Sequence, residues 1–292
     1  MSWESIRDAV FVFDHYGELL VLLQNALWAG AFIGLVGGLI GTFVMMRDMA
    51  FSVHGIAELS FAGAAIALLI GADIVTGSLL GSVVAAVIIG IVGAQSRESN
   101  SVVGVLMPFG LGMGILALAL YQGRSANRFA LLTGQIVSVD AVQLTSMAVL
   151  CAVVVVGLLV IWRPLSFAST DPLVAQARGL PVRGLSMAFM LLLGIAVALS
   201  VQIIGALLVL ALLISPAAAA MNFSASPVKI VLLSVLFAET SMVGGILLAL
   251  GGSLPISPYV TTISFFIWLV SWVARRRRQR SAARTAATQA AE

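Results

Sequence analysis

The chain has 292 residues, of which 61% are hydrophobic and 9% charged, and its mean hydropathy is +1.14. About a quarter of the residues of a soluble domain are charged, and no soluble fold of this length could bury so much apolar surface. The composition therefore excludes a soluble protein and predicts an all-α, polytopic transmembrane helical bundle. The net charge of +3 depends on the arginines of the C-terminal tail, which are Arg275, Arg276, Arg277, Arg278, Arg280 and Arg284.

The N-terminal segment, residues 1–18, is acidic and aromatic. It contains Glu4, Asp8, Asp14 and Glu18, and it lacks the basic start and apolar core of a secretory signal peptide. Aromatic side chains among these acids favour a position at the membrane interface. We expect this segment to lie on the extracytoplasmic side.

Residues 19–274 form the predicted transmembrane domain. A spanning helix needs about 20 mostly apolar residues, and about nine stretches meet that requirement. Pro216, near the end of the seventh stretch, suggests a break in that helix. The approximate limits of the nine stretches are 20–45, 52–70, 77–95, 103–121, 142–162, 184–202, 204–222, 229–250 and 257–274.

Arginine and lysine positions orient these helices, because cytoplasmic loops of membrane proteins are enriched in both. With the basic tail, residues 275–292, in the cytoplasm, nine spans place the N-terminus outside. The inner side then holds twelve basic residues and the outer side three. We expect the tail to contact lipid, to be disordered beyond its first few residues and to bind no nucleic acid. The inner loops carry Arg47, Arg97, Arg163, Arg178, Arg183 and Lys229, and the outer ones Arg7, Arg124 and Arg128.

His54 and Glu58 stand four residues apart inside the second span, so they share one helical face. Ionisable groups within the membrane are costly and often mark functional sites. Imidazole and carboxylate are ligands for zinc, manganese and ferrous iron. Because ligation needs an ionised carboxylate and a neutral imidazole, acidification should weaken such a site. The alternative is a His–Glu hydrogen bond that fixes a helix contact.

Glu239 is the other acid within an apolar stretch. In one interpretation its side chain faces a central pore or a dimer interface and ligates metal. In the other it accepts hydrogen bonds from the hydroxyls of Thr240 or Ser241. With only His15 and His54 in the chain, a catalytic metal site of three protein ligands is hard to assemble. The sequence contains no GxxxxGK[ST] motif, so we expect no ATP binding by that route.

The loop "STDPLVAQARGLPVRGL" (169–185) has the pattern of a short capped helix. Asp171 or Thr170 can cap its start, with Pro172 in the first turn, and Gly179 fits the position just past its end. A rigid helix of about two turns on the cytoplasmic face suits docking to a partner. The alternative is a simple connector between spans. The positions that define the pattern are Asp171, Pro172, Ala175, Gly179, Leu180 and Pro181.

These residues carry a family resemblance. "DPLVAQARGLPVRGL" (171–185) resembles the cytoplasmic coupling segment of permease subunits of bacterial metal-ion ABC importers, the zinc/manganese/iron group, whose pattern is close to DPxxAxxxGLP. "IGALLVLALLISPAAAA" (204–220) resembles the segment that follows it. "GTFVMMRDMAFSVHGIAELSFAGAAIA" (41–67) resembles their second-span region, and "LPISPYVTTISFFIWLVSWV" (254–273) their final span. The resemblance runs from about residue 20 to 274.

The resemblance implies the permease fold of a metal-type ABC importer in a bacterial inner membrane. Such a chain moves a divalent metal into the cytoplasm, zinc first in our expectation and then manganese or iron. The metal is cargo, and no permanent cofactor is expected. The implied partners are an extracytoplasmic metal-binding protein, a second permease protomer and a cytoplasmic ATP-binding subunit that docks near residues 171–179. That subunit would hydrolyse ATP, so this chain would not be an enzyme.

The family usually places Asp and then His four residues apart in the second span, whereas here His54 and Glu58 exchange that order. The resemblance carries the metal role onto these two residues, and a two-fold homodimer would bring four ligands together. Two alternatives stay open. One is an ABC permease for a siderophore, haem or cobalamin, and the other is a gradient-driven secondary transporter.

Overall fold

The computed structural model describes residues 23–93, 99–123, 139–206, 208–250 and 255–289. Within these ranges the chain forms ten helices and no strand, and eight of the helices are long and apolar enough to cross a membrane. The predicted all-α, polytopic bundle is confirmed. The N-terminal segment 1–18 and the basic positions Arg97, Arg124 and Arg128 lie outside the described residues.

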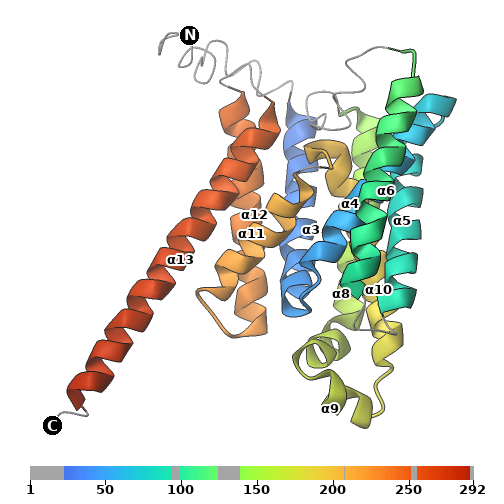
Figure 1. The fold of residues 1–292 in the computed structure, drawn as a ribbon. Coiled ribbons are helices and arrows are strands. Elements are labelled where there is room, and N and C mark those ends of the chain that lie inside the picture. The colour runs from blue at the N-terminus through green and yellow to red at the C-terminus, as the bar shows by residue number, and fades with distance from the viewer. Residues whose placement is uncertain (1–22, 94–98, 124–138, 207, 251–254, 290–292) are drawn as a thin grey trace.

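The helices follow the predicted order (Figure 1). The eight long ones are α3 (Gln24–Met46), α4 (Ala50–Ile70), α5 (Ile74–Gly93), α6 (Ser99–Leu120), α8 (Ala141–Thr170), α10 (Val182–Ile204), α12 (Pro227–Ala249) and α13 (Ile256–Gln289). The two short ones are α9 (Pro172–Ala177) and α11 (Val209–Met221).

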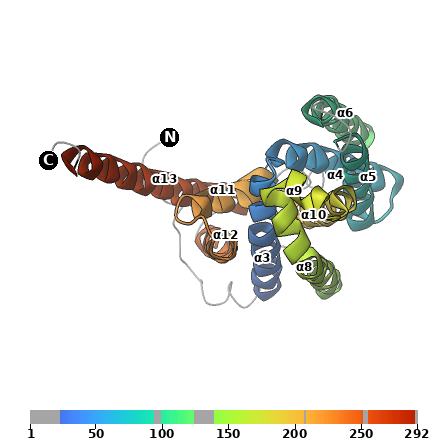
Figure 2. The same ribbon diagram turned by 90° about the horizontal axis from the view of Figure 1, so that it is seen from below.

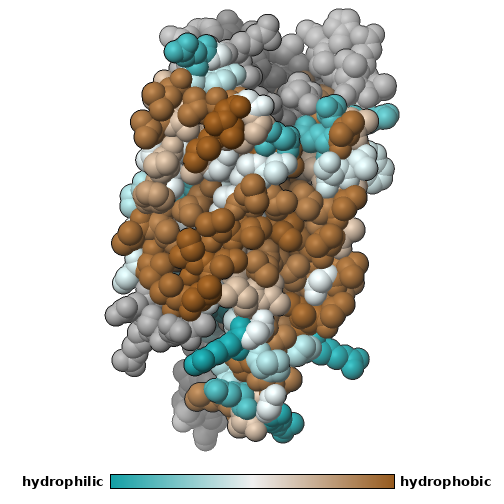
Figure 3. Space-filling model, turned by 90° about the vertical axis from the view of Figure 1, so that its right-hand side faces the viewer, coloured by the Kyte–Doolittle hydropathy of each residue, from teal (hydrophilic) through white to brown (hydrophobic). Residues whose placement is uncertain are grey.

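The bundle has two parts that meet at α3. Helix α4 packs against α5, α6 and α10, whereas α11, α12 and α13 pack against one another. Helix α3 contacts α8 and α10 on one side and α11 and α12 on the other, as the view from below in Figure 2 shows. A broad band of hydrophobic side chains crosses the face drawn in Figure 3, with hydrophilic residues at both its ends. This pattern is the one expected of a bilayer-spanning bundle.

The predicted seventh span needs correction. Helix α11 has 13 residues, about 20 Å of helix, which is short of the roughly 30 Å hydrocarbon core. Pro216 lies inside α11 and does not break it. The break comes earlier, at Gly205, whose φ of +84° ends α10 in a conformation that favours glycine. Proline is tolerated in α11 because packed neighbours can compensate the lost backbone hydrogen bond.

The C-terminal tail also differs from the expectation of disorder, because α13 continues through the arginine run to Gln289. Arginine, glutamine and alanine are good helix formers. The Arg276 guanidinium lies 4.0 Å from the ring centre of Trp272, one turn earlier on the same helix. The Arg278 guanidinium lies 5.6 Å from the ring centre of Phe223. These contacts stabilise the helical conformation at the start of the tail.

Glycines set the close approach of α3 to α11 and α12. A β-carbon added at Gly38 would overlap the backbone of Val235 on α12, and one added at Gly41 would overlap the carbonyl oxygen of Leu213 on α11. Small residues let transmembrane helices approach until their backbones touch. The expected packing role of the glycines in "AGAFIGLVGGLIG" is confirmed at these positions.

Gly41→Ala is therefore expected to destabilise the bundle by about 1–3 kcal/mol, because α3 and α11 must separate to admit the methyl group. Thermal unfolding of the detergent-solubilised protein measures the effect. Gly112→Ala is the matched control, because Gly112 is exposed on α6 and has open space around its α-carbon. Equal unfolding temperatures for the two variants would contradict the packing role.

Candidate functional site

The predicted pair lies on α4. His54 Nε2 and Glu58 Oε1 are 3.7 Å apart, and the side chains are 26% and 4% exposed. The two residues share a face, as their spacing predicts. Glu58 lies roughly 12 Å along the helix axis from Ala50, close to the middle of the span.

Two polar atoms of the pair have no partner. His54 Nδ1 and Glu58 Oε2 are buried, and each lacks a hydrogen bond. The 3.7 Å separation between the facing atoms is longer than a hydrogen bond. The two side chains therefore lie within ion-pair distance without a hydrogen bond between them, and the choice between a metal site and a helix contact stays a prediction. Buried polar atoms without partners are rare, and these have the chemistry of cation ligands.

The backbone beside the pair is tightly enclosed by α6. A β-carbon at Gly110 would lie 3.0 Å from the carbonyl carbon of Glu58, and one at Gly55 would lie 2.8 Å from a methyl carbon of Val103. Glycines at these two positions let α4 and α6 pack closely along the segment that carries the pair. The packing limits how far the Glu58 backbone can shift, which is what a defined ligand geometry requires.

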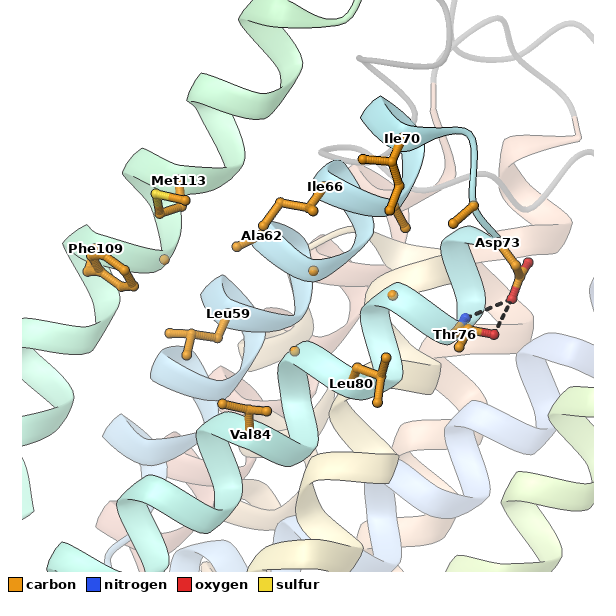
Figure 4. A pocket seen from close by; sticks show the side chains of 16 residues that line it. Leu59, Ala62, Ile66, Ile70, Asp73, Thr76, Leu80, Val84, Phe109 and Met113 are labelled. Carbon is orange, nitrogen blue, oxygen red and sulfur yellow. Dashed lines mark hydrogen bonds between the residues drawn. The ribbon is translucent and has the colours of Figure 1, made fainter.

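An apolar cavity of about 490 Å³ begins next to Glu58, at Leu59 and Gly110, and lies between α4, α5 and α6. Figure 4 shows Ala62, Ile66 and Ile70 along its α4 wall, with Asp73 and Thr76 at the far end. The lining is otherwise apolar, so the cavity itself offers no second ligand set.

Asp73 caps the start of α5. Its Oδ2 accepts hydrogen bonds from the Thr76 hydroxyl at 2.6 Å and the Thr76 backbone N–H at 2.8 Å. These bonds, the side-chain one first, lower the pKa of Asp73. Asp140 plays the same role at α8, where its Oδ1 accepts from the Gln143 backbone N–H at 2.6 Å. Both acids stabilise helix ends.

Glu239 lies in another part of the bundle. It is half-buried on α12, where a β-carbon at Gly34 of α3 would be 3.0 Å from its Oε2. The hydroxyls of Thr240 and Ser241 donate to the carbonyls of Leu236 and Phe237, so they do not cap the acid. Among the described residues no three His, Cys, Asp or Glu side chains gather as a metal site. A metal role for Glu239 stays a prediction.

The expected short capped helix is present as α9, and its cytoplasmic location stays a prediction. Asp171 Oδ1 accepts from the Val174 backbone N–H at 3.0 Å, and Pro172 is the first helical residue. Gly179 follows the helix with a φ of +81°. The helix ends in paired backbone hydrogen bonds that its glycine allows, from Gly179 N–H to Gln176 O and from Leu180 N–H to Ala175 O. Thus Asp171, and not Thr170, is the cap.

One face of α9 is anchored and the other is exposed. Ala175 is fully buried in a small apolar cluster with Ala168 and Leu185, at the ends of α8 and α10. Leu173 is 79% exposed, and α9 lies beyond the lower end of the bundle in Figure 1. Pro181 lies at the start of α10. An exposed leucine on a rigid, anchored helix is suited to contact a partner.

The sequence predicts Arg47 only as a basic residue of an inner loop, whereas the structure gives it specific hydrogen bonds. Its guanidinium donates hydrogen bonds to the hydroxyls of Ser169 and Ser186, at the two ends of the α9 segment. These contacts join residues more than 120 positions apart, so no local sequence pattern indicates them.

Comparison with known proteins identifies the family. A family model described as the ABC 3 transport family matches residues 20–275. The chain belongs to this family. The manganese transport system membrane protein MntC of Halalkalibacterium halodurans is 31% identical over 225 residues, which is 77% of each chain. The zinc uptake system membrane protein ZnuB of Haemophilus influenzae is 23% identical over 257 residues, covering 88% of this chain and 98% of ZnuB.

A solved structure supports the same assignment. The structure of PsaBC from Streptococcus pneumoniae in complex with a Fab matches with a TM-score of 0.80 and 25% sequence identity. The match covers 89% of this chain and 95% of that one. The sequence resemblance to metal-ion ABC importers is therefore confirmed, and the ABC-3 chain described here is a metal-ion permease that crosses the membrane several times.

Proposed function

We propose that this ABC-3 permease imports a divalent transition metal, with manganese as the first candidate and zinc as the second. The observation that carries the proposal is the His54/Glu58 pair on α4, in which each side chain has one buried polar atom without a hydrogen-bond partner. Nitrogen and oxygen donors without thiolate suit both metals. Manganese moves ahead of zinc in our order because the relative with the higher identity is named for manganese transport.

A second protomer would complete the site. One chain supplies two ligands, and no larger His, Cys, Asp or Glu group forms within the described residues. A two-fold homodimer with α4 near its axis would bring two imidazoles and two carboxylates together. Four such ligands can strip part of the hydration shell of a cation. A transit site must still release its ion, which favours this modest ligand set over a thiolate cage.

The charge distribution supports the orientation that we propose, with the C-terminus in the cytoplasm. In the described residues the basic positions fall at the α3–α4 turn, around α9, at the start of α12 and in the C-terminal part of α13. Figure 1 draws these parts of the ribbon at the end of the bundle that carries α9. The basic positions include Arg47, Arg163, Arg178, Arg183, Lys229 and the arginines that begin at Arg275. By the positive-inside rule this end faces the cytoplasm.

The mechanism follows from that orientation. An ATP-binding subunit would dock on α9, and a metal-binding protein would deliver its ion at the opposite end. ATP-driven movement of α9 would shift the bundle between outward and inward access around the metal pair. The chain's own task is to hold and release the ion, while ATP hydrolysis belongs to the partner.

Reconstituted vesicles test the proposal. The permease, its ATPase and its binding protein are assembled in vesicles, and ATP is supplied on the side of the membrane where the ATPase is bound. The accumulation of manganese, zinc and iron is then measured. We expect ATP-dependent accumulation of manganese, and a loss of accumulation with an ATPase variant that cannot hydrolyse ATP. Haem and cobalamin serve as comparison cargoes. Uptake of these chelates alone, or metal uptake driven by a proton gradient without ATP, would overturn the proposal.

A further inference from the structure

Arg47 bridges two helices from the end of a third. It follows the last residue of α3, and its two terminal nitrogens donate to Ser169 Oγ in the last turn of α8, at 3.3 Å, and to Ser186 Oγ near the start of α10. These serines lie on the two sides of the α9 segment. A single planar guanidinium can make both bonds because its donors are arranged as a rigid fork.

Aromatic contacts reinforce the same junction. The Arg47 guanidinium lies 5.7 Å from the ring centre of Phe189 on α10. Phe43, one turn earlier on α3, packs 6.1 Å from Phe189 and meets Trp162 of α8 edge-on at 5.1 Å between ring centres. The end of α3 is thus held between α8 and α10.

The hydrogen bonds from Arg47 to the two serines can break and re-form. Both acceptors are neutral hydroxyls, and within the described residues Arg47 forms no ion pair. Its Nε is buried without a hydrogen-bond partner. Hydrogen bonds to neutral acceptors are easier to break than a buried ion pair. The two serine contacts can therefore adjust as the helix ends move, without leaving a buried carboxylate unpaired.

A short, ordered turn connects Arg47 to the helix that carries the metal pair. Only Asp48 and Met49 follow before α4 begins, and Asp48 has a φ of +55°. Backbone N–H groups of Arg47 and Met49 donate to the carbonyls of Phe43 and Val44, at 3.0 and 2.9 Å. His54 follows Arg47 by seven residues. A displacement of Arg47 is thus passed to the first turns of α4 with little slack.

We infer that Arg47 is the positioning residue that couples movement of α9 to the His54/Glu58 helix. Helix α9 is packed through Ala175 onto the ends of α8 and α10, so these ends move with it. Arg47 holds both ends and passes their movement into the α3–α4 turn. This inference rests on the proposed function, because it concerns how ATP hydrolysis by the partner is transmitted to the metal pair.

The test compares metal uptake per ATP hydrolysed in the reconstituted complex. Arg47→Gln is expected to assemble with the ATPase and keep its basal ATPase rate, while manganese uptake per ATP falls about tenfold or more. Arg47→Lys should recover part of the coupling, because an ammonium keeps the charge but lacks the fork. Arg163→Gln is the matched control, since Arg163 is an exposed arginine on α8 at the same end of the bundle, and it should leave the ratio unchanged.

A second variant protects the test against misfolding. The double change Ser169→Ala and Ser186→Ala removes both acceptors and retains Arg47, and it should lower uptake per ATP in the same direction. If uptake per ATP is unchanged in Arg47→Gln, the coupling role is overturned. If Arg47→Gln does not assemble, an unchanged uptake per ATP in the serine double variant overturns it. In both cases ATP-dependent uptake by the wild-type complex leaves the proposed function standing. Absence of ATP-dependent metal uptake by the wild-type complex overturns both.

Discussion

His54→Ala and Glu58→Gln are each expected to lower metal uptake on the order of a hundredfold, to background, in the reconstituted complex. Loss of groups that only orient a metal ligand typically costs 10- to 100-fold, so loss of a ligand should cost at least as much. In a two-fold dimer each substitution also removes two donors at once. Glu58→Gln keeps the size of the side chain and removes its charge, so it separates ligation from packing.

The control for this first prediction is Glu239→Gln, the same carboxyl-to-amide change on α12. Glu239 lies against α3, and no group of three ligating side chains forms around it in the described part of the chain. We expect Glu239→Gln to reduce uptake much less than Glu58→Gln. Unchanged uptake in both α4 variants, with normal assembly, would make the pair a structural feature. A loss in Glu239→Gln equal to that in Glu58→Gln would place Glu239 on the same path.

Leu173→Asp is expected to weaken docking of the ATP-binding subunit strongly. Leu173 is 79% exposed in the first turn of α9, so its replacement should leave the permease fold intact. A carboxylate buried at an interface without a partner costs about 2 kcal/mol or more, in addition to the lost apolar contact of Leu173. Affinity for the ATPase should fall roughly thirtyfold or more, since about 1.4 kcal/mol corresponds to tenfold. Co-purification and titration of the ATPase onto the reconstituted permease measure the loss.

Val228→Asp is the matched control for the docking prediction. Val228 is 56% exposed at the start of α12, at the same end of the bundle but away from α9. It should retain the ATPase and support metal uptake. An ATPase that binds Leu173→Asp with wild-type affinity would contradict the assignment of α9 as the docking helix.

The parts that sequence could predict depend on local rules. Long apolar stretches located six of the spans to within about four residues at each end, whereas α8 and α13 continue well past their predicted ends and α11 is shorter than predicted. Asp171, Pro172 and Gly179 defined the ends of α9 because capping involves neighbours in the chain. The spacing of His54 and Glu58 placed them on one face for the same reason. Helical periodicity and capping need no knowledge of the tertiary structure.

The parts that sequence could not predict depend on contacts between distant segments. Pro216 suggested a break that its packed surroundings make unnecessary, while Gly205 gave no comparable signal among many glycines. The Arg47 junction joins α3 to serines on α8 and α10, and such a meeting follows only from the packing of whole helices. The lack of hydroxyl caps on Glu239 is likewise a matter of side-chain direction.

The turn between α10 and α11 has a consequence for how this protein tolerates change. Helix α11 is only about 20 Å long, and Asn222 at its C-terminal end accepts a hydrogen bond from Arg275. With that end at the cytoplasmic surface in the proposed orientation, the turn would lie within the hydrocarbon layer. Peptide groups at that depth have no water to bond with. The Ile204 carbonyl instead accepts a hydrogen bond from the Ser257 hydroxyl on α13 at 3.0 Å. In a mutational scan, Ser257 would register as intolerant because it bonds to the backbone, without any need for contact with an ion. Sensitivity to mutation at this depth therefore reports on the solvation of the backbone as well as on the transport path.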